Sequence, residues 1–203
     1  MRKKNYVVRT NRAIALRKKL FETAANLFEK EGYENVSVDE ICSKVGVTKG
    51  AFYGHFKSKD QIVLEQMAVS DKGYDTEILA KVSHMKPGLD KLMEYIRTVI
   101  AYQERFNKRL IRLSYAIRTL NTDTAHILIP NKRQLYYILD RLIIEGQACG
   151  EIRDDIASSQ IAEVLLYWIR GMVFSWSLPG NRFSIKKKGD FLVEILRPGL
   201  KKQ

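Results

Sequence analysis

The residues of this chain best suited to chemistry with another molecule are the lysines and arginines near its N-terminus, because such side chains bind phosphate. Residues 1–60 hold 13 basic and 7 acidic side chains, whereas the remaining 143 residues hold 22 and 16. The net charge is +6 in both parts, so net positive charge is more than twice as dense in the first 60 residues, which favours a polyanion through counterion release. Taken alone, the run could also be a solvated surface with no partner. The basic residues that precede the first carboxylate, Glu22, are Arg2, Lys3, Lys4, Arg9, Arg12, Arg17, Lys18 and Lys19.

Catalytic chemistry has little support in the sequence. His55, His84 and His126 are scattered and lack the spacing of a metal site. The glycines are isolated and form no phosphate-cradling loop, and Asp154-Asp155 suits a turn and a helix cap. We therefore predict no enzyme, no metal site and no resident cofactor.

The composition is that of a folded, largely helical chain. Its 203 residues are 45% hydrophobic and include only four prolines, enough for one sizeable domain or two smaller ones. The two cysteines make no disulfide framework, which fits a reducing compartment. The most apolar stretch, residues 161–178, is interrupted by Glu163 and Arg170 and is too short for a membrane span. With no signal peptide recognised, we expect a bacterial cytoplasmic, nucleoid-associated protein and no membrane partner.

Two short helices with a glycine turn between them are predicted over residues 37–56. Ser37 and Glu40 form a capping box at the start of the first helix, and Gly46 suits its end. Thr48 can cap a second helix from Lys49 to about Phe56. The apolar side of the pair is formed by Val38, Ile41, Cys42, Val45, Phe52 and Phe56.

Such a pair is either an ordinary αα-hairpin or a helix-turn-helix, which lays its second helix in the DNA major groove. The basic N-terminal arm beside it favours the helix-turn-helix, and hence double-stranded DNA as the partner.

The side of the second helix opposite Phe52 is centred on Gly50, Ala51 and Gly54, so its middle has almost no side chain. Close approach of the main chain to DNA is then possible, and longer side chains must reach in from the flanks. We expect sparse base readout, with Lys49 on guanine and the Ala51 methyl on thymine. DNA shape and the arm residues would supply more of the specificity. The flanking residues are Lys49, Tyr53 and His55, and the arm residues are Arg2, Lys3 and Lys4.

A further helix is predicted from Ser58, and Lys59 lies in its first turn. The helix macrodipole disfavours a cation at this position. Either a bound phosphate compensates for Lys59, or the helix tolerates a surface lysine there.

The rest of the chain is predicted to be helical as well, giving an all-α fold without strands. The apolar periodicity and the Pro-Gly breaks predict helices over residues 11–31, 89–106, 108–120, 130 to about 146–150, 156–178 and 188–197. The basic, compact part, residues 10–70, is expected to be the DNA-binding domain. The longer amphipathic helices of residues 71–203 form the second expected domain.

The N-terminal residues resemble the DNA-binding domain of the tetracycline-repressor-like (TetR/AcrR) family over roughly residues 10–70. The resemblance implies an all-helical dimer whose larger domain holds a small-molecule pocket and dimerises through its last two long helices. It implies phosphate contacts for Ser37 and Lys59, and contacts to backbone or base edges for Tyr53 and His55. Thr48 and Lys49 open the recognition helix, and Ala51 stands where the family often has a hydroxyl residue. The matching residues are Leu20-Phe21 through Phe28, Gly32-Tyr33, Ser37, Ile41, Val45-Gly46-Val47, Lys49-Gly50, Phe52-Tyr53, His55-Phe56 and Lys59-Asp60.

Residues for a ligand pocket are harder to separate from core residues. Aromatic stripes at helical spacing form either a packed core or an apolar pocket. Arg170, inside an apolar helix, either pairs with Glu163 or meets an anionic ligand or a partner subunit. The candidate pocket residues are Tyr95, Val99, Tyr102, Phe106, Tyr115, Tyr136, Trp168, Arg170 and Phe174.

The helix over residues 156–178 is apolar on most sides, so one face is expected to meet the core and the other a second copy. The last helix, with Phe191 and Ile195, would complete a four-helix dimer interface. A two-fold dimer predicts a palindromic operator. We therefore expect a dimeric repressor released by an unidentified small-molecule effector. The alternative is a DNA-binding protein without an effector, acting architecturally or through a protein partner.

Overall fold

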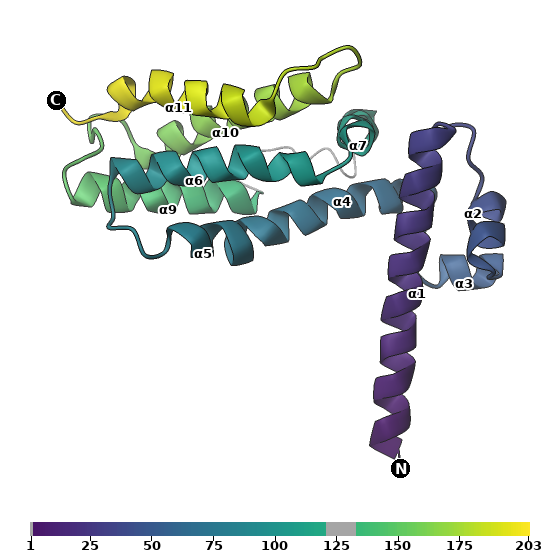
Figure 1. The fold of residues 1–203 in the computed structure, drawn as a ribbon. Helices are drawn as coiled ribbons and strands as arrows, with labels where there is room; N and C mark the ends of the chain where they lie inside the picture. The colour runs from purple at the N-terminus through teal and green to yellow at the C-terminus, as the bar shows by residue number, and fades with distance from the viewer. Residues whose placement is uncertain (1, 121–132) are drawn as a thin grey trace. The chain divides into compact units, whose positions relative to one another are not determined.

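The computed structural model describes residues 2–120 and 133–203, and within them all side chains except those of residues 2–10, 66–71 and 120. No strand occurs in these two ranges; the only extended pairing there is an isolated bridge between Ile152 and Lys201. The prediction of an all-helical fold is confirmed. The chain divides into two compact units, residues 1–66 and residues 67–203 (Figure 1).

The first unit contains α1 (Arg2–Lys30), α2 (Val38–Val45), α3 (Lys49–Tyr53) and the start of α4 (Lys59–Gly73). The predicted start of α1 at Asn11 was wrong, because nothing between residues 2 and 10 breaks a helix. Its core takes buried side chains from every helix, which fixes α3 against α1 and α2. The fully buried residues are Leu20, Ala24, Phe28, Ile41, Phe52, Phe56, Ile62 and Val63.

The Ser37 and Thr48 hydroxyl caps predicted for the two short helices are present. The Ser37 hydroxyl accepts a hydrogen bond from the Glu40 amide at 3.1 Å, and Gly46 ends α2 with a φ of 81°. The Thr48 hydroxyl accepts from the Ala51 amide at 3.2 Å. α3 ends at Tyr53 rather than near Phe56, but the turn that follows still directs Phe56 into the core.

In the second unit, α4 continues into the π-helix η1 (Tyr74–Ile78) and then α5 (Leu79–Val82). A Cβ on Gly73 would overlap the Tyr102 hydroxyl oxygen, so the Tyr102 phenol occupies the space of a side chain at the start of η1. π-Helices are rare and usually occur as single turns.

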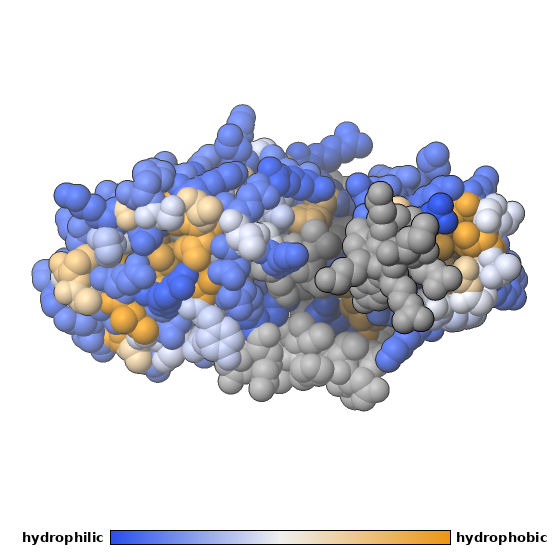
Figure 2. Space-filling model, turned by 90° about the horizontal axis from the view of Figure 1, so that it is seen from below, coloured by the Kyte–Doolittle hydropathy of each residue, from blue (hydrophilic) through white to orange (hydrophobic). Residues whose placement is uncertain are grey.

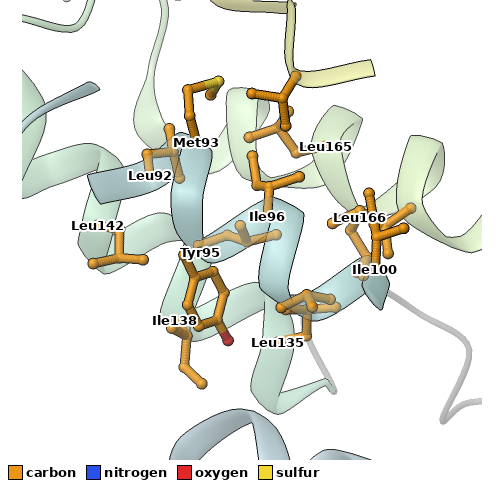
Figure 3. Close-up of a cluster of buried hydrophobic side chains, with 14 of the residues drawn as sticks. Leu92, Met93, Tyr95, Ile96, Ile100, Leu135, Ile138, Leu142, Leu165 and Leu166 are labelled. Carbon is orange, nitrogen blue, oxygen red and sulfur yellow. The ribbon is translucent and has the colours of Figure 1, made fainter. Parts of the chain in front are cut away.

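The long helices of this unit lie side by side, and α7 (Lys108–Leu120) runs across their direction (Figure 1). Together they enclose the larger core of the chain (Figure 3). Among the coloured residues on the face of the chain drawn in Figure 2, most are hydrophilic, and apolar residues gather in several patches. The elements are α6 (Leu89–Tyr102), the 3-10 turn η2 (Gln103–Arg105), α7 (Lys108–Leu120), α9 (Gln134–Ala148), α10 (Ser158–Ser177) and α11 (Ile185–Leu200).

The predicted bounds of α7 are correct, and those of two other helices need correction. α6 gives way to the 3-10 turn after Tyr102 instead of reaching Phe106. α11 begins at Ile185, where Ser184 caps it, and passes through Pro198 to Leu200. The turn after Pro198 is held because the Leu200 carbonyl accepts from the Arg153 amide at 2.9 Å. Pro130, the predicted start of α9, lies outside the described residues, and the described helix begins at Gln134.

Candidate functional site

The exposed side of α3 is the candidate DNA-reading surface. Thr48, Lys49 and Gly50 are exposed, and the Tyr53 side chain is 53% exposed. The opposite side is anchored by Phe52, whose ring packs edge-on against Tyr53 with a centroid distance of 5.4 Å. An apolar side in the core and an uncovered polar side is the arrangement that a recognition helix requires.

Gly50 leaves a bare patch in the middle of this surface. A Cβ placed there would contact only the Thr48 hydroxyl oxygen, at 3.8 Å, so the fold itself does not require glycine at position 50. Ala51 beside it is half-buried. The main chain of α3 is therefore accessible to a large partner, such as DNA that receives the helix in its major groove.

Lys49 is held by a carboxylate on the neighbouring helix. Its ammonium lies 2.8 Å from Asp39 Oδ1, and both side chains are well exposed. Exposed ion pairs contribute only about 0–1 kcal/mol, so a phosphate or a guanine could take the place of Asp39.

Lys59 is bound within the unit. Its ammonium donates to the carbonyl oxygens of Tyr33 at 2.9 Å and of Val36 at 3.2 Å, and it lies 4.2 Å from the centre of the Tyr33 ring. The Tyr33 hydroxyl in turn donates to Asp60. These contacts compensate for a cation in the first turn of α4 without a bound phosphate. A phosphate contact by Lys59 remains a prediction, since its ammonium has a third donor.

Arg17 has a role that the sequence analysis missed. It is one of the basic residues that precede Glu22, but its guanidinium donates to both oxygens of Glu65, at 3.2 Å and 2.6 Å, and to the carbonyl of His55. It also lies 4.2 Å above the Phe56 ring. Arg17 thus fixes the turn after α3 to α1 and α4. Glu65 is 48 residues away, so no local spacing could have revealed this pair.

The remaining predicted DNA contacts are only partly described. Ser37 is exposed beside α2, and His55 is half-buried. The side chains of Arg2, Lys3 and Lys4 lie outside the described residues. Their predicted contacts with DNA stay predictions.

Three of the candidate pocket residues lie in the core of the second unit. Tyr95 and Val99 are fully buried, and Tyr102 is 9% exposed. Gln103, which the sequence analysis missed, donates to the Tyr74 hydroxyl at 3.0 Å in the same core. These residues of α6 and the adjoining turn contribute to core packing and to a buried hydrogen-bond network. Figure 3 labels residues of this core from α6, α9 and α10: Leu92, Met93, Tyr95, Ile96, Ile100, Leu135, Ile138, Leu142, Leu165 and Leu166.

The other candidates are distributed between the inside and the outside of the unit. Phe106, Tyr115 and Tyr136 are partly buried against the core. Tyr115 packs edge-on against Phe174, with 5.5 Å between the ring centres. Trp168 is 51% exposed and does not join the others.

Arg170 does not pair with Glu163. The Glu163 carboxylate accepts a hydrogen bond from Tyr167, and Arg170 has no ion pair within the two described ranges. Its Nη2 is buried without a hydrogen-bond partner there. Burial lowers the pKa of the Arg170 guanidinium, and the nearby charge of Arg133 lowers it further.

Tyr115 lies in a cationic environment. Burial raises the pKa of its phenol to about 12, and Tyr74 contributes in the same direction. Three guanidiniums act in the opposite direction because they are close enough to favour a phenolate, namely Arg133, Arg170 and Arg118. Arg118 and Arg133 were not singled out from the sequence.

A shallow apolar groove lies on the outside of α10 and α11. Phe191 and Ile195 are 56% and 52% exposed there. Exposed Trp168 and Tyr167 line the same groove. This uncovered face matches the predicted dimerisation elements.

The described residues contain no group of three or more His, Cys, Asp or Glu side chains placed to hold a metal ion. Among their helices, none is both long and apolar enough to cross a bilayer.

Comparison with known proteins places this geometry in context. Residues 20–65 match the family described as "Bacterial regulatory proteins, tetR family". The chain is 25% identical over 192 residues to the HTH-type transcriptional repressor DhaR of Mycobacterium sp. (strain GP1), covering 90% of this chain and 93% of that protein.

Solved structures share the fold over nearly the whole chain. One is a transcriptional regulator of Saccharomonospora viridis in complex with choline, with a TM-score of 0.69, 21% identity, and coverage of 92% and 98% of the two chains. Another is FadR of Bacillus subtilis in complex with stearoyl-CoA, with a TM-score of 0.73, 19% identity, and coverage of 90% and 98%.

Proposed function

Because the chain belongs to the TetR family of bacterial regulatory proteins, a family of DNA-binding transcriptional regulators and not of enzymes, we propose that it is a dimeric repressor released from a palindromic operator by a small molecule. Residues 10–70 are the proposed DNA-binding domain, and residues 71–203 the proposed effector and dimerisation domain. Such a protein acts on the chromosome, so we expect it in the bacterial cytoplasm at the nucleoid.

The exposed side of α3 is the observation that carries the proposal. Thr48, Lys49 and Tyr53 are uncovered there, while Phe52 and Phe56 hold the helix rigidly from behind. We assign base and backbone contacts to Lys49, Tyr53 and His55, and phosphate contacts to Ser37 and Lys59. The arm residues Arg2, Lys3 and Lys4 are the proposed source of further contacts.

The uncovered face of α10 and α11 supports a homodimer. Trp168 and Phe191, both about half exposed, would be buried if a second copy packed its own α10 and α11 against them. The two-fold axis of such a dimer would present two recognition helices to half-sites related by a palindrome.

A small-molecule effector is supported by two proteins of the same fold, which were solved in complex with choline and with stearoyl-CoA. The effector would bind within residues 71–203 and alter the separation of the two recognition helices. A coupling free energy of about 1–3 kcal/mol is typical of such regulation.

The experiment that tests the proposal is capture of genomic DNA fragments by the purified full-length chain at physiological salt. Recovery of one or a few palindromic sites, lost in Lys49→Ala/Tyr53→Ala, is expected. Both side chains are exposed, so this variant should fold. Arg182→Gln, which changes an exposed arginine of the second unit, is the matched control and should recover the same sites. Broad, salt-sensitive recovery without a motif would instead favour a DNA-binding protein that acts architecturally.

A further inference from the structure

Two arginines of the second unit are buried almost completely. Arg118, in the last turn of α7, is 4% exposed, and Arg133, at the start of α9, is 6% exposed. Arginine is seldom buried to this extent, because removing its charge from water is costly unless an anionic group faces it.

A third guanidinium lies in the same region. Arg170 projects from the middle of α10, half-buried, and the charge of Arg133 acts on it. All three arginines also act on the buried phenol of Tyr115. Three helices, α7, α9 and α10, therefore bring like charges together around one side chain.

This gathering of positive charge is electrostatically unfavourable by itself. Arg118 and Arg133 each have a further interaction with another part of the chain. For Arg170, the groups that act on it within the described residues are Tyr115, Arg133 and Tyr167, and none of them is a carboxylate. Its buried Nη2 has no hydrogen-bond partner there.

The start of α9 adds to the same field. Arg133 is the N-cap residue of this 15-residue helix, and its own side chain makes no capping hydrogen bond to the amides of the first turn. A helix N-terminus carries a partial positive charge and normally favours an acidic or neutral cap. A cation here is the opposite of that preference.

We propose that Arg118, Arg133 and Arg170, with Tyr115, bind the acidic head group of an anionic effector. Guanidinium groups bind carboxylate and phosphate with paired, parallel hydrogen bonds, so either head group fits. The part of the ligand next to the head group is apolar, because Tyr115 packs against the ring of Phe174 and the unit core. This inference rests on the proposed function, because it takes the anion to be the effector of the repressor.

Calorimetric titration of the full-length chain in the absence of DNA tests the inference. The probes are decanoate and decyl phosphate, and 1-decanol and decyltrimethylammonium carry the same tail without a negative charge. We expect both acids, or one of them, to bind, and the neutral and cationic probes not to. Binding of only one acid identifies the head group as carboxylate or phosphate.

Arg170→Gln is expected to weaken binding of the acid at least about tenfold, the effect of losing one charge-assisted contact. Because burial already disfavours the Arg170 charge, the ligand-free variant should melt at the same or a higher temperature. An arginine with a purely structural role would give a lower one. Arg182→Gln is the control and should bind as the wild type does.

Binding of 1-decanol as tight as that of decanoate, no binding of either acid, or unchanged binding by Arg170→Gln would each overturn the inference. Operator binding is measured separately on the same samples. A chain that binds decanoate but no operator would overturn the proposed function alone. A chain that binds an operator but neither acid would overturn this inference and leave the repressor proposal standing.

Discussion

At the scale of single residues, Gly50 is a position where a substitution should affect DNA affinity without lowering the stability of the fold. We predict that Gly50→Ala keeps or raises the melting temperature, since the new Cβ meets only the Thr48 hydroxyl oxygen at 3.8 Å and alanine favours helix by up to about 1 kcal/mol. Affinity for the captured operator should fall at least about tenfold, because the methyl group lies where the main chain would approach the groove. Thermal unfolding and fluorescence anisotropy measure the two effects. Unchanged operator affinity would show that the bare patch is not used.

Lys59 is expected to matter for stability whether or not it binds phosphate. Lys59→Met removes two hydrogen bonds to carbonyl oxygens and the contact with the Tyr33 ring, and should lower the free energy of unfolding by about 1–2 kcal/mol. Lys57→Ala, an exposed neighbour, should change it by less than about 0.5 kcal/mol. Chemical denaturation followed by circular dichroism provides the comparison. Equal stability of the two variants would mean that the contacts of Lys59 contribute nothing to folding.

What the sequence could predict at this scale depended on how close the interacting residues lie along the chain. The caps at Ser37 and Thr48 involve residues three positions away and were predicted correctly. The partners of Lys59 and Arg17 lie 23 to 48 residues away, so their structural roles had no local signal. Buried arginines such as Arg118 are equally invisible, because their surroundings come from other helices.

At the scale of helices, α11 packs closely on α6 through a glycine. Gly189→Ala should destabilise the chain by about 1–3 kcal/mol, because its Cβ would lie 2.8 Å and 3.2 Å from side-chain atoms of Ile100. Gly199→Ala in the same helix has no atom within 4 Å of its new Cβ and should be neutral or slightly stabilising. Urea denaturation of both variants tests this packing. A neutral Gly189→Ala would mean that α6 and α11 can move apart freely.

Helix boundaries were predictable where a capping residue or a helix breaker lies at the boundary itself. The end of α2 at Gly46 followed from such a signal. The start of α1 did not, because the basic run before Asn11 contains no helix breaker. Pro198 was misread as a stop, since contacts with the distant Arg153 hold the turn that follows it.

At the scale of the whole molecule, the apolar face of α10 and α11 should decide the oligomeric state. Trp168→Glu and Phe191→Glu are each expected to convert a dimer into a monomer, since losing a central aromatic contact costs about 2 kcal/mol or more, roughly a 30-fold weakening. Sedimentation velocity at micromolar concentration measures the change. Ile144→Glu, an equally exposed apolar residue of α9 outside this groove, is the control and should stay dimeric. If both aromatic variants also stayed dimeric, the interface would lie elsewhere.

Periodicity alone could not divide the aromatic residues of the second unit between core and surface. Tyr95 and Trp168 both lie in strongly apolar helices, yet one is fully buried and the other is half exposed. The difference depends on which neighbouring helix covers each face, and this is a property of the assembled bundle.

The Asp39 carboxylate competes with DNA for Lys49, because the two side chains form an ion pair. A DNA group that binds Lys49 must first displace the Asp39 carboxylate, which lies 2.8 Å away. A guanine at the correct position compensates for this loss with hydrogen bonds to Lys49, whereas a random sequence does not. Asp39→Asn should therefore tighten binding to random DNA more than binding to the operator, and steepen the salt dependence by about one phosphate contact. Anisotropy titrations with both DNAs across a salt series would measure this loss of discrimination. Asp39 would thus increase the preference for the operator over random DNA, because it stays paired with Lys49 until the correct base pair is present.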